Sequence, residues 1–208
     1  MIEPPTLIVM AKAPRVGVGK TRLAAEIGKA EAWRINRALH AATLRAACDR
    51  RWRTLLCVTP DRAASEAIDV WPRSVARIGQ GGGDLGARLA RAIAGRRNVA
   101  VIGTDCPEIS SMLIAAAFAA LRRAPFALGP AHDGGFWLLA ARSGDRAARA
   151  FAPVRWSTQH AAEDVLAKLG AVNVAILPRL RDVDTGADLE QIRAERTAAL
   201  PRPPLGFA

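Results

Sequence analysis

The fold of this chain is decided by residues 99–107, which read Val-Ala-Val-Ile-Gly-Thr-Asp-Cys-Pro. Four consecutive small aliphatic residues, three of them β-branched, are typical of a strand buried on both faces of a parallel sheet. Gly103 and Pro107 end the run, so we expect Asp105 where the strand leaves the sheet. This edge is where open α/β sheets bind ligands, and a carboxylate there suits a divalent metal on a phosphate. It equally suits a cap for the next helix, so the stretch alone leaves both interpretations open.

Segments of strand and helix character alternate through the rest of the sequence. Strands are expected over residues 6–11, 53–59, 75–78, 126–128, 136–141 and 172–177. Helices are expected from residue 21 and over residues 31–51, 84–94, 110–122, 158–169 and 188–196. This alternation predicts a three-layer α/β/α architecture with a mostly parallel sheet. We expect one domain over residues 1–200 and a proline-rich tail over residues 201–208.

The composition favours anionic small molecules as partners. Thirty Lys and Arg residues against 19 Asp and Glu give a net charge of +11, which attracts anions. The arginines are scattered and no Tyr is present, so a base-stacking surface for nucleic acid is poorly supported. No apolar run approaches the roughly 20 residues of a membrane span. Without a secretory leader, and with three widely spaced cysteines, the chain is expected in the reducing cytoplasm.

A glycine-containing basic loop follows the first expected strand. Residues 13–21 read Ala-Pro-Arg-Val-Gly-Val-Gly-Lys-Thr, which ends like a P-loop but carries Pro14 where that motif requires glycine. Proline has no N–H to donate, so the P-loop interpretation is rejected. The loop can still bind phosphate, although an ordinary basic surface loop remains the alternative. The candidate phosphate ligands are Lys12, Gly17, Gly19, Lys20 and Arg22.

Acidic residues recur at two further expected strand ends. Asp133 lies in a loop with two glycines after it, and Asp182 and Asp184 precede the last expected helix. Helix capping would account well for Asp188 and poorly for Asp182. Three acidic strand ends together with a basic glycine loop indicate a nucleoside diphosphate bridged by Mg²⁺ or Mn²⁺.

The order of these motifs resembles that of an uncharacterised transferase family with a glycosyltransferase-A-like fold, often called radical-SAM/selenodomain-associated transferase. That family is itself similar to the nucleotidyltransferases of molybdenum-cofactor and coenzyme F420 biosynthesis. The resemblance extends from about Leu7 to Ile192, and its motifs are specific as an ordered set. The matching segments are residues 11–14, 20–23, 80–89, 103–107, 129–136, 156–158 and 182–185.

The resemblance implies roles for individual residues. Asp105 would bind the metal, with Asp184, alone or with Asp182, as the second carboxylate. Lys20 and Arg22 would face the phosphates. The chain departs from glycosyltransferases because residues 104–106 contain one acid where those enzymes carry D-x-D. It departs from sugar pyrophosphorylases because its glycine loop, residues 17–23, is one residue longer than their G-x-G-T-R-[LM] motif. The residues implied near the nucleobase are Gln80, Gly83 and Asp84.

The expected function is a metal-dependent transfer of a glycosyl group from a nucleotide-sugar to a small acceptor. Lys20, Asp105 and Asp133 are the candidate catalytic residues, and Asp133 either acts on the acceptor hydroxyl or only shapes its loop. The alternative is nucleotidyl transfer, which releases pyrophosphate from a nucleoside triphosphate. A non-catalytic basic module is the least favoured hypothesis. No nucleic-acid partner or membrane span is expected, and assembly as a homodimer is left open.

Overall fold

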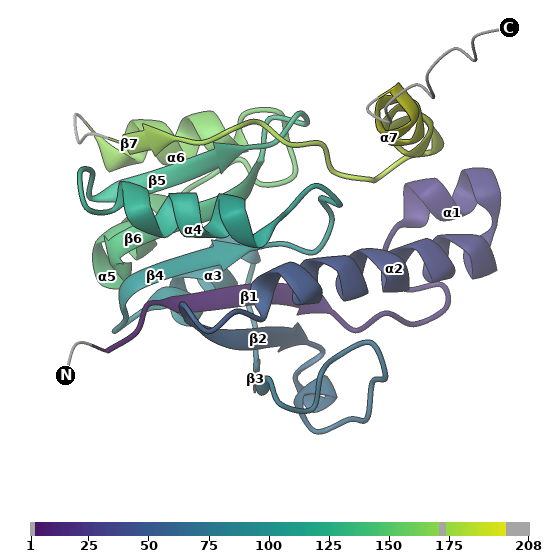
Figure 1. Cartoon of the computed structure of the whole chain (residues 1–208), viewed down its shortest axis with the longest axis horizontal. Helices are drawn as coiled ribbons and strands as arrows, with labels where there is room; N and C mark the ends of the chain where they lie inside the picture. The colour runs from purple at the N-terminus through teal and green to yellow at the C-terminus, as the bar shows by residue number, and fades with distance from the viewer. Residues whose placement is uncertain (1–2, 171–173, 199–208) are drawn as a thin grey trace, which may run out of the picture.

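The chain builds one seven-stranded sheet with the strand order β3-β2-β1-β4-β6-β5-β7 (Figure 1). The computed structural model describes residues 3–170 and 174–198, so the tail expected at 201–208 and the start of the strand expected at 172 lie outside it. The strands are β1 (Thr6–Lys12), β2 (Arg53–Thr59), β3 (Ala76–Gly79), β4 (Arg97–Ile102), β5 (Phe126–Pro130), β6 (Phe136–Ser143) and β7 (Val174–Ile176).

All neighbouring strands pair in parallel except around β6, which is antiparallel to both β4 and β5. The mostly parallel sheet predicted from the sequence is therefore confirmed. Because β6 runs backwards, its first residue, Phe136, lies at the edge where β4 and β5 end. This reversal places an amino-terminal strand end beside the carboxyl ends that usually bind ligands.

Helices cover both faces of the sheet, which confirms the three-layer architecture (Figure 1). One apolar core joins the sheet to α2 and α4, and a second joins the opposite face to α3, α5 and α6. A smaller core links α1, α2 and α7 at one end of the sheet. The helices are α1 (Thr21–Ile27), α2 (Lys29–Ala47), α3 (Leu85–Ile93), α4 (Ser111–Ala120), α5 (Gly144–Ala148), α6 (Ala161–Leu169) and α7 (Gly186–Ala198), with 3-10 turns η1 (Asp61–Ala64) and η2 (Arg149–Phe151).

Strand β4 is buried on both faces, as its sequence predicts. Ala100 and Ile102 belong to the core under α2 and α4, while Val99 and Val101 belong to the opposite core. All four side chains are at most 1% exposed. Full burial of a Val or Ile side chain stabilises a fold by about 1.5–3 kcal/mol, so β4 is the central anchor of the sheet.

Three local expectations differ from the structure. The helix expected over residues 31–51 ends at Ala47, because Cys48 has an extended backbone with a φ of −81° and a ψ of 92°. The helix expected from Thr158 begins only at Ala161, because the Thr158 hydroxyl donates to the Arg155 carbonyl oxygen at 2.7 Å and holds a turn. The five-residue helix α5 was not expected, since it is too short to show a helical period.

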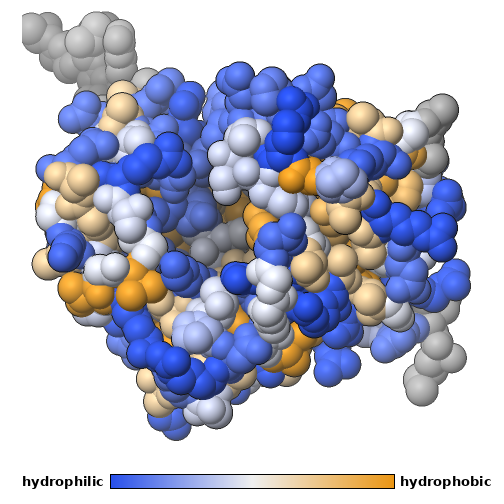
Figure 2. Space-filling model, turned by 180° about the vertical axis from the view of Figure 1, so that it is seen from behind, coloured by the Kyte–Doolittle hydropathy of each residue, from blue (hydrophilic) through white to orange (hydrophobic). Residues whose placement is uncertain are grey.

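The outer surface is predominantly hydrophilic and is hollowed near the centre of the face seen in Figure 2. Large exposed hydrophobic side chains in the described part of the chain are few: Val16, Leu85, Met112 and Ile176. Among the described helices, none has the length and apolar character needed to cross a lipid bilayer.

Candidate functional site

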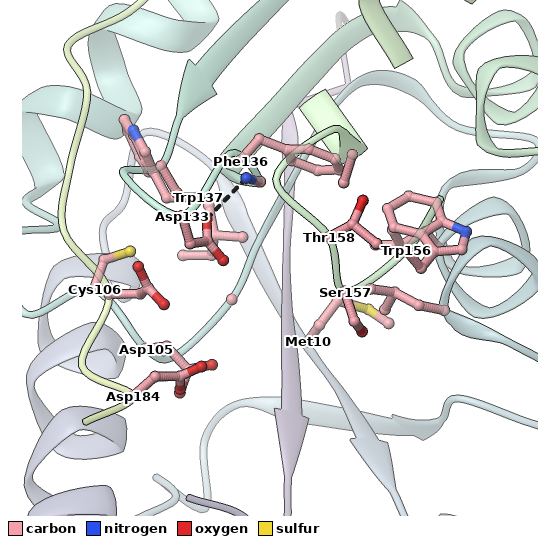
Figure 3. Close-up of a pocket in the computed structure, with 18 of the residues that line it drawn as sticks. Met10, Asp105, Cys106, Asp133, Phe136, Trp137, Trp156, Ser157, Thr158 and Asp184 are labelled. Carbon is pink, nitrogen blue, oxygen red and sulfur yellow. Dashed lines mark hydrogen bonds between the residues drawn. The ribbon is translucent and has the colours of Figure 1, made fainter. Parts of the chain in front are cut away.

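A cavity of about 550 Å³ opens where β4 leaves the sheet. Loops that follow β4 and β5, the turn before α6 and the segment before α7 form its walls. Figure 3 shows Asp105 and Asp184 together on one side and the rings of Phe136 and Trp156 on the other. We call these sides the charged half and the apolar half. The charged half comprises Arg22, Asp105, Asp182 and Asp184, and the apolar half comprises Met10, Leu85, Leu89, Phe136 and Trp156.

Lys20 joins two of the three carboxylates of the charged half. Its Nζ lies 2.5 Å from Asp105 Oδ1 and 3.0 Å from Asp184 Oδ1. Arg22 adds a second cation, with its guanidinium 2.6 Å from Asp184 Oδ2. The Lys20 side chain is only 5% exposed, so the ammonium is enclosed by these carboxylates. The structure thus gathers residues from both ends of the chain around one buried positive charge.

Asp105 does not serve as a helix cap. The N-cap of α4 is Ser110, whose hydroxyl accepts a hydrogen bond from Leu113 N at 3.3 Å. The backbone oxygen of Asp105 instead accepts from Val183 N at 3.0 Å, which ties the segment before α7 to the end of β4. The carboxylate of Asp105 is left facing the cavity, where it contacts Lys20. The geometry therefore favours the ligand-binding interpretation over capping.

The backbone at Lys20 has a conformation that ordinary residues rarely adopt. Its φ of 48° and ψ of 40° lie in the left-handed region, immediately before α1. This conformation costs a non-glycine residue about 1–2 kcal/mol. Such strain is concentrated at functional sites, where the side chain is directed to a place that regular structure would not reach. Here it directs the ammonium toward Asp105 and Asp184.

Electrostatics in the charged half follow from burial and crowding. Burial alone would lower the pKa of Lys20, but Asp105 and Asp184 outweigh it and raise that pKa above its usual value. Burial, together with the neighbouring carboxylates Asp133 and Asp184, raises the pKa of Asp182 to about 6. A carboxyl group crowded by other carboxylates is relieved by a cation. Asp188, by contrast, accepts hydrogen bonds from Thr185 N and Asp184 N at the start of α7, as helix capping predicts.

Asp133 lies between the two halves, in the loop that joins β5 to β6. Its Oδ1 accepts a hydrogen bond from Gly135 N at 2.8 Å. Gly134 has a φ of 86°, and a Cβ there would lie 2.1 Å from the carbonyl oxygen of Gln159. Only glycine permits this approach, so the Asp133 loop and the turn before α6 form one rigid wall.

The other residues that the sequence singled out lie outside the cavity lining. Gln80 is buried, and its amide donates to the carbonyl oxygens of Cys57 at 3.0 Å and Ala11 at 3.3 Å. Asp84 caps α3 by accepting from Ala87 N at 2.8 Å. The remaining residues that do not line the cavity are Lys12, Gly17, Gly19 and Gly83, and Lys20 reaches it only through its ion pairs.

The sequence did not point to the apolar half. Trp156 belongs to a matched motif, yet no role was inferred for it, and Phe136 has the character of an ordinary core residue. The structure packs Phe136, Phe151 and Trp156 as three mutually contacting rings, with centroids 6.0 to 6.5 Å apart. The only available signals in the sequence were an aromatic residue that follows two glycines at the start of a strand, and a tryptophan followed by two residues with hydroxyl groups.

A buried histidine supports the charged half from behind. Trp71 Nε1 donates to His40 Nδ1 at 3.0 Å, and His40 Nε2 lies 3.4 Å from the hydroxyl of Thr104. Since Nδ1 accepts, Nε2 carries the proton and donates to Thr104, which precedes Asp105. Burial lowers the pKa of His40 to about 4, so the imidazole is neutral at physiological pH.

Comparisons with known proteins agree with this architecture. The family model described as "Uncharacterized protein conserved in bacteria (DUF2064)" matches residues 42–158, more than half of the chain. A crystal structure from Desulfovibrio desulfuricans G20, provisionally named a nucleotide-diphospho-sugar transferase, is 25% identical with a TM-score of 0.83, covering 95% of this chain and 90% of that chain. A search of curated proteins finds no match.

Two more distant structures share the fold. The 4-diphosphocytidyl-2C-methyl-D-erythritol synthase of Anaerococcus prevotii is 9% identical, with a TM-score of 0.62 over 94% of this chain and 96% of that chain. Rv0371c of Mycobacterium tuberculosis, solved in complex with manganese, is 18% identical, with a TM-score of 0.52 over 91% of this chain and 97% of that chain. At these identities the likeness extends to the fold alone.

Proposed function

The chain belongs to the bacterial DUF2064 family, and we propose that it is a transferase that moves a glycosyl group from a nucleoside diphosphate-sugar to a small acceptor. One observation carries this proposal: Lys20 lies within 3.0 Å of both Asp105 and Asp184 at the ligand-binding edge of the sheet. The structure named a nucleotide-diphospho-sugar transferase supports the transferase class. Within DUF2064, the motif order leads us to propose membership of the radical-SAM/selenodomain-associated transferases.

The donor atoms of the charged half suit Mg²⁺ or Mn²⁺. Asp105 and Asp184 offer carboxylate oxygens, which these hard cations prefer, and Asp182 adds a carboxyl group that a cation would relieve. Within residues 3–170 and 174–198, no group of three or more acidic, His or Cys side chains is arranged to hold a metal. A cation bound here would therefore need substrate phosphates to complete its shell, as Mg²⁺ commonly does in proteins. When bound, the ion would neutralise charge on the departing diphosphate.

The side chains of the protein itself have separate roles in the proposed reaction. Lys20 and Arg22 bind the diphosphate oxygens and stabilise the negative charge that grows on them as the sugar departs. Asp133, between the two halves, positions the acceptor hydroxyl and takes its proton. The loop that contains Gln80, Gly83 and Asp84 remains our prediction for the nucleobase side, with Lys12, Gly17 and Gly19 beside the phosphates. A cytoplasmic location also remains a prediction.

Identification of the leaving group tests the proposal directly. The purified protein is incubated with Mg²⁺ or Mn²⁺ and either nucleotide-sugars or nucleoside triphosphates, and binding and products are measured. Release of a nucleoside diphosphate supports glycosyl transfer. Release of pyrophosphate would instead identify nucleotidyl transfer. Absence of metal-dependent nucleotide binding would leave only the basic binding module.

A further inference from the structure

The apolar half of the cavity presents a surface that does not suit a phosphate group. Its lining is hydrocarbon and aromatic: Met10, Leu85, Leu89, Phe136 and Trp156. Leu85 lines this concave surface and is 43% exposed. Figure 3 shows Phe136, Trp156 and Met10 facing the cavity from the side opposite Asp105 and Asp184. A ligand with an apolar face would cover this surface and gain from its removal from water.

The aromatic wall is preformed. Phe136 and Trp156 meet edge-on with ring centroids 6.2 Å apart, and both pack against Phe151. Gly86 of α3 allows this packing, because a Cβ there would lie 2.3 Å from the Phe151 carbonyl oxygen and 2.7 Å from Trp156 Nε1. The rings therefore need no rearrangement before a ligand stacks on them, and preorganisation of this kind lowers the cost of binding.

Charge separates the two halves. Arg22 is the only cationic side chain among the described residues that line the cavity, and its guanidinium is paired with Asp184. Lys20 likewise pairs with Asp105 and Asp184, and in the proposed function both cations face the diphosphate of the donor, away from the apolar half. An anionic group placed against the aromatic wall would face Asp133 without a cation beside it. Like charges held close together in this way are strongly unfavourable.

Asp133 has a carboxylate oxygen available at the border of the two halves. Its Oδ1 is held by Gly135 N, whereas its Oδ2 has no hydrogen-bond partner within the described part of the chain. Ser157 and Thr158, in the rigid turn packed on the same loop, also line the cavity. A hydroxyl group of a ligand stacked on Phe136 and Trp156 would meet this carboxylate.

From this arrangement we infer that the acceptor is an uncharged or cationic small molecule that lays an apolar face on Phe136 and Trp156 and presents a hydroxyl to Asp133. The inference rests on the proposed function and names its second substrate class. In the step it implies, the acceptor oxygen forms a bond to the anomeric carbon and its proton passes to Asp133 Oδ2. The bond from that carbon to the phosphate oxygen breaks, and its electron pair leaves with the nucleoside diphosphate.

A matched series of fragments tests the inference. The protein is first loaded with Mg²⁺ and UDP, GDP or CDP, so that phosphate fills the charged half. Benzyl alcohol, benzylamine and phenyl phosphate are then titrated and followed by ligand-observed NMR. We expect the alcohol and the amine to bind at least about tenfold more tightly than phenyl phosphate, because the apolar half lacks a cation. Equal or tighter binding of phenyl phosphate would overturn the inference.

Two substitutions test whether the fragments bind against the apolar half of the cavity. Leu85→Ala, at an exposed position where folding is not at risk, should weaken benzyl alcohol by about fivefold through lost apolar contact. Trp156→Leu should weaken it by about tenfold through loss of the stacked ring. Met112→Ala, at a 77% exposed position on α4, is the matched control and should change nothing. If Leu85→Ala bound as tightly as Met112→Ala, the fragment would lie elsewhere and the inference would fail.

Nucleotide binding, measured in the same samples, separates this inference from the proposed function. Metal-dependent nucleotide binding combined with a preference for phenyl phosphate would leave the transferase standing and overturn the acceptor class. Failure of every nucleotide to bind would overturn the proposed function itself, and with it the inference.

Discussion

The two halves of the cavity are held together by different interactions. Both halves join residues from distant parts of the chain. In the charged half Lys20, Asp105 and Asp184 meet as ion pairs. In the apolar half the side chains meet by packing, as the rings of Phe136 and Trp156 do. The charged half is therefore sensitive to the loss of a single charge, and the apolar half to the loss of packed volume.

The two halves are expected to differ in how strongly they select among ligands. In the proposed function, phosphate and metal present the same chemistry whatever sugar or acceptor is used, so we expect the charged half to be indifferent to the identity of both. Among the described residues that line the cavity, we expect the apolar half to distinguish one acceptor from another by shape and polarity. The following experiments aim at each half in turn.

The largest effect is expected at the charged half, from Asp105→Asn. The change removes one of the two carboxylates that face Lys20 and should lower metal-dependent turnover by about a thousandfold, near 4 kcal/mol of transition-state stabilisation. A turnover assay measures this loss, calorimetry with Mn²⁺ and nucleotide measures the accompanying loss of binding, and circular dichroism verifies the fold. Asp69→Asn makes the same change in the exposed ion pair with Arg37 and is the control. Full nucleotide affinity in Asp105→Asn would restore a purely structural role for Asp105.

The second experiment addresses the buried support of the charged half. The pKa of His40 is lowered by burial from 6.5 to about 4. Between pH 6.5 and pH 4 the His40 side chain is protonated in the unfolded chain and neutral in the folded chain. The free energy of unfolding is therefore greatest above pH 6.5 and decreases as the pH falls toward 4. The loss attributable to His40 should reach about 3 kcal/mol. Urea unfolding across that pH range measures the change.

The variant His40→Gln should be less stable than the parent at neutral pH and should lose most of this pH dependence. His160→Gln, at a residue with a 40% exposed side chain, is the matched control and should retain it. An unchanged slope in His40→Gln would show that other groups cause the acid sensitivity.

The third experiment tests the rigidity of the wall that carries Asp133. Gly134→Ala adds a Cβ that would lie 2.1 Å from the Gln159 carbonyl oxygen, at a φ of 86°. We expect destabilisation of about 2 kcal/mol or more, from backbone strain and the clash together. Gly95→Ala, with a φ of 69° and open space, isolates the cost of the φ angle alone. Equal stability of the two variants would mean that the loop and turn are not locked together.

The smallest effect, and the most diagnostic, is expected from Lys20→Met. Loss of the ammonium should weaken nucleotide binding by about tenfold, because one charge-assisted contact to phosphate disappears. Affinity for Mn²⁺ alone should rise, since Asp105 and Asp184 are freed of their internal cation. Titrations of each ligand separately would show the opposite signs, with Lys168→Met as the control. Parallel losses of both affinities would contradict the arrangement proposed for Lys20.

The sequence was most informative where the signal is local. The strand expected over residues 53–59 matches β2 at both ends, because a short apolar run bounded by Pro60 specifies it. The direction of β6 had no such signal, since an apolar strand reads the same in a parallel or antiparallel sheet. Helix α5 was missed for lack of length, and Thr158 was placed in a helix although its hydroxyl closes a turn instead.

The site shows the same division. Acids at strand ends indicated Asp105 and Asp184 because strand ends share one edge of a parallel sheet. The ion pairs of Lys20 could not be predicted, as they depend on its left-handed backbone and on the approach of a segment 164 positions later. The sequence resemblance implied a place near the nucleobase for Gln80, but not the two buried carbonyl groups to which its amide donates. Phe136 and Trp156 have the composition of core residues, and only their placement reveals an open face.

The hydrogen bond from Val183 N to the Asp105 carbonyl oxygen has a consequence for synthesis of the protein. While the ribosome is still adding the residues before Asp184, the strands from β1 to β6 can already pair, yet one of the two partners of Lys20 is missing. Asp184 follows every strand in chain order, so the ion pairs of the charged half can be completed only after the whole sheet has been synthesised.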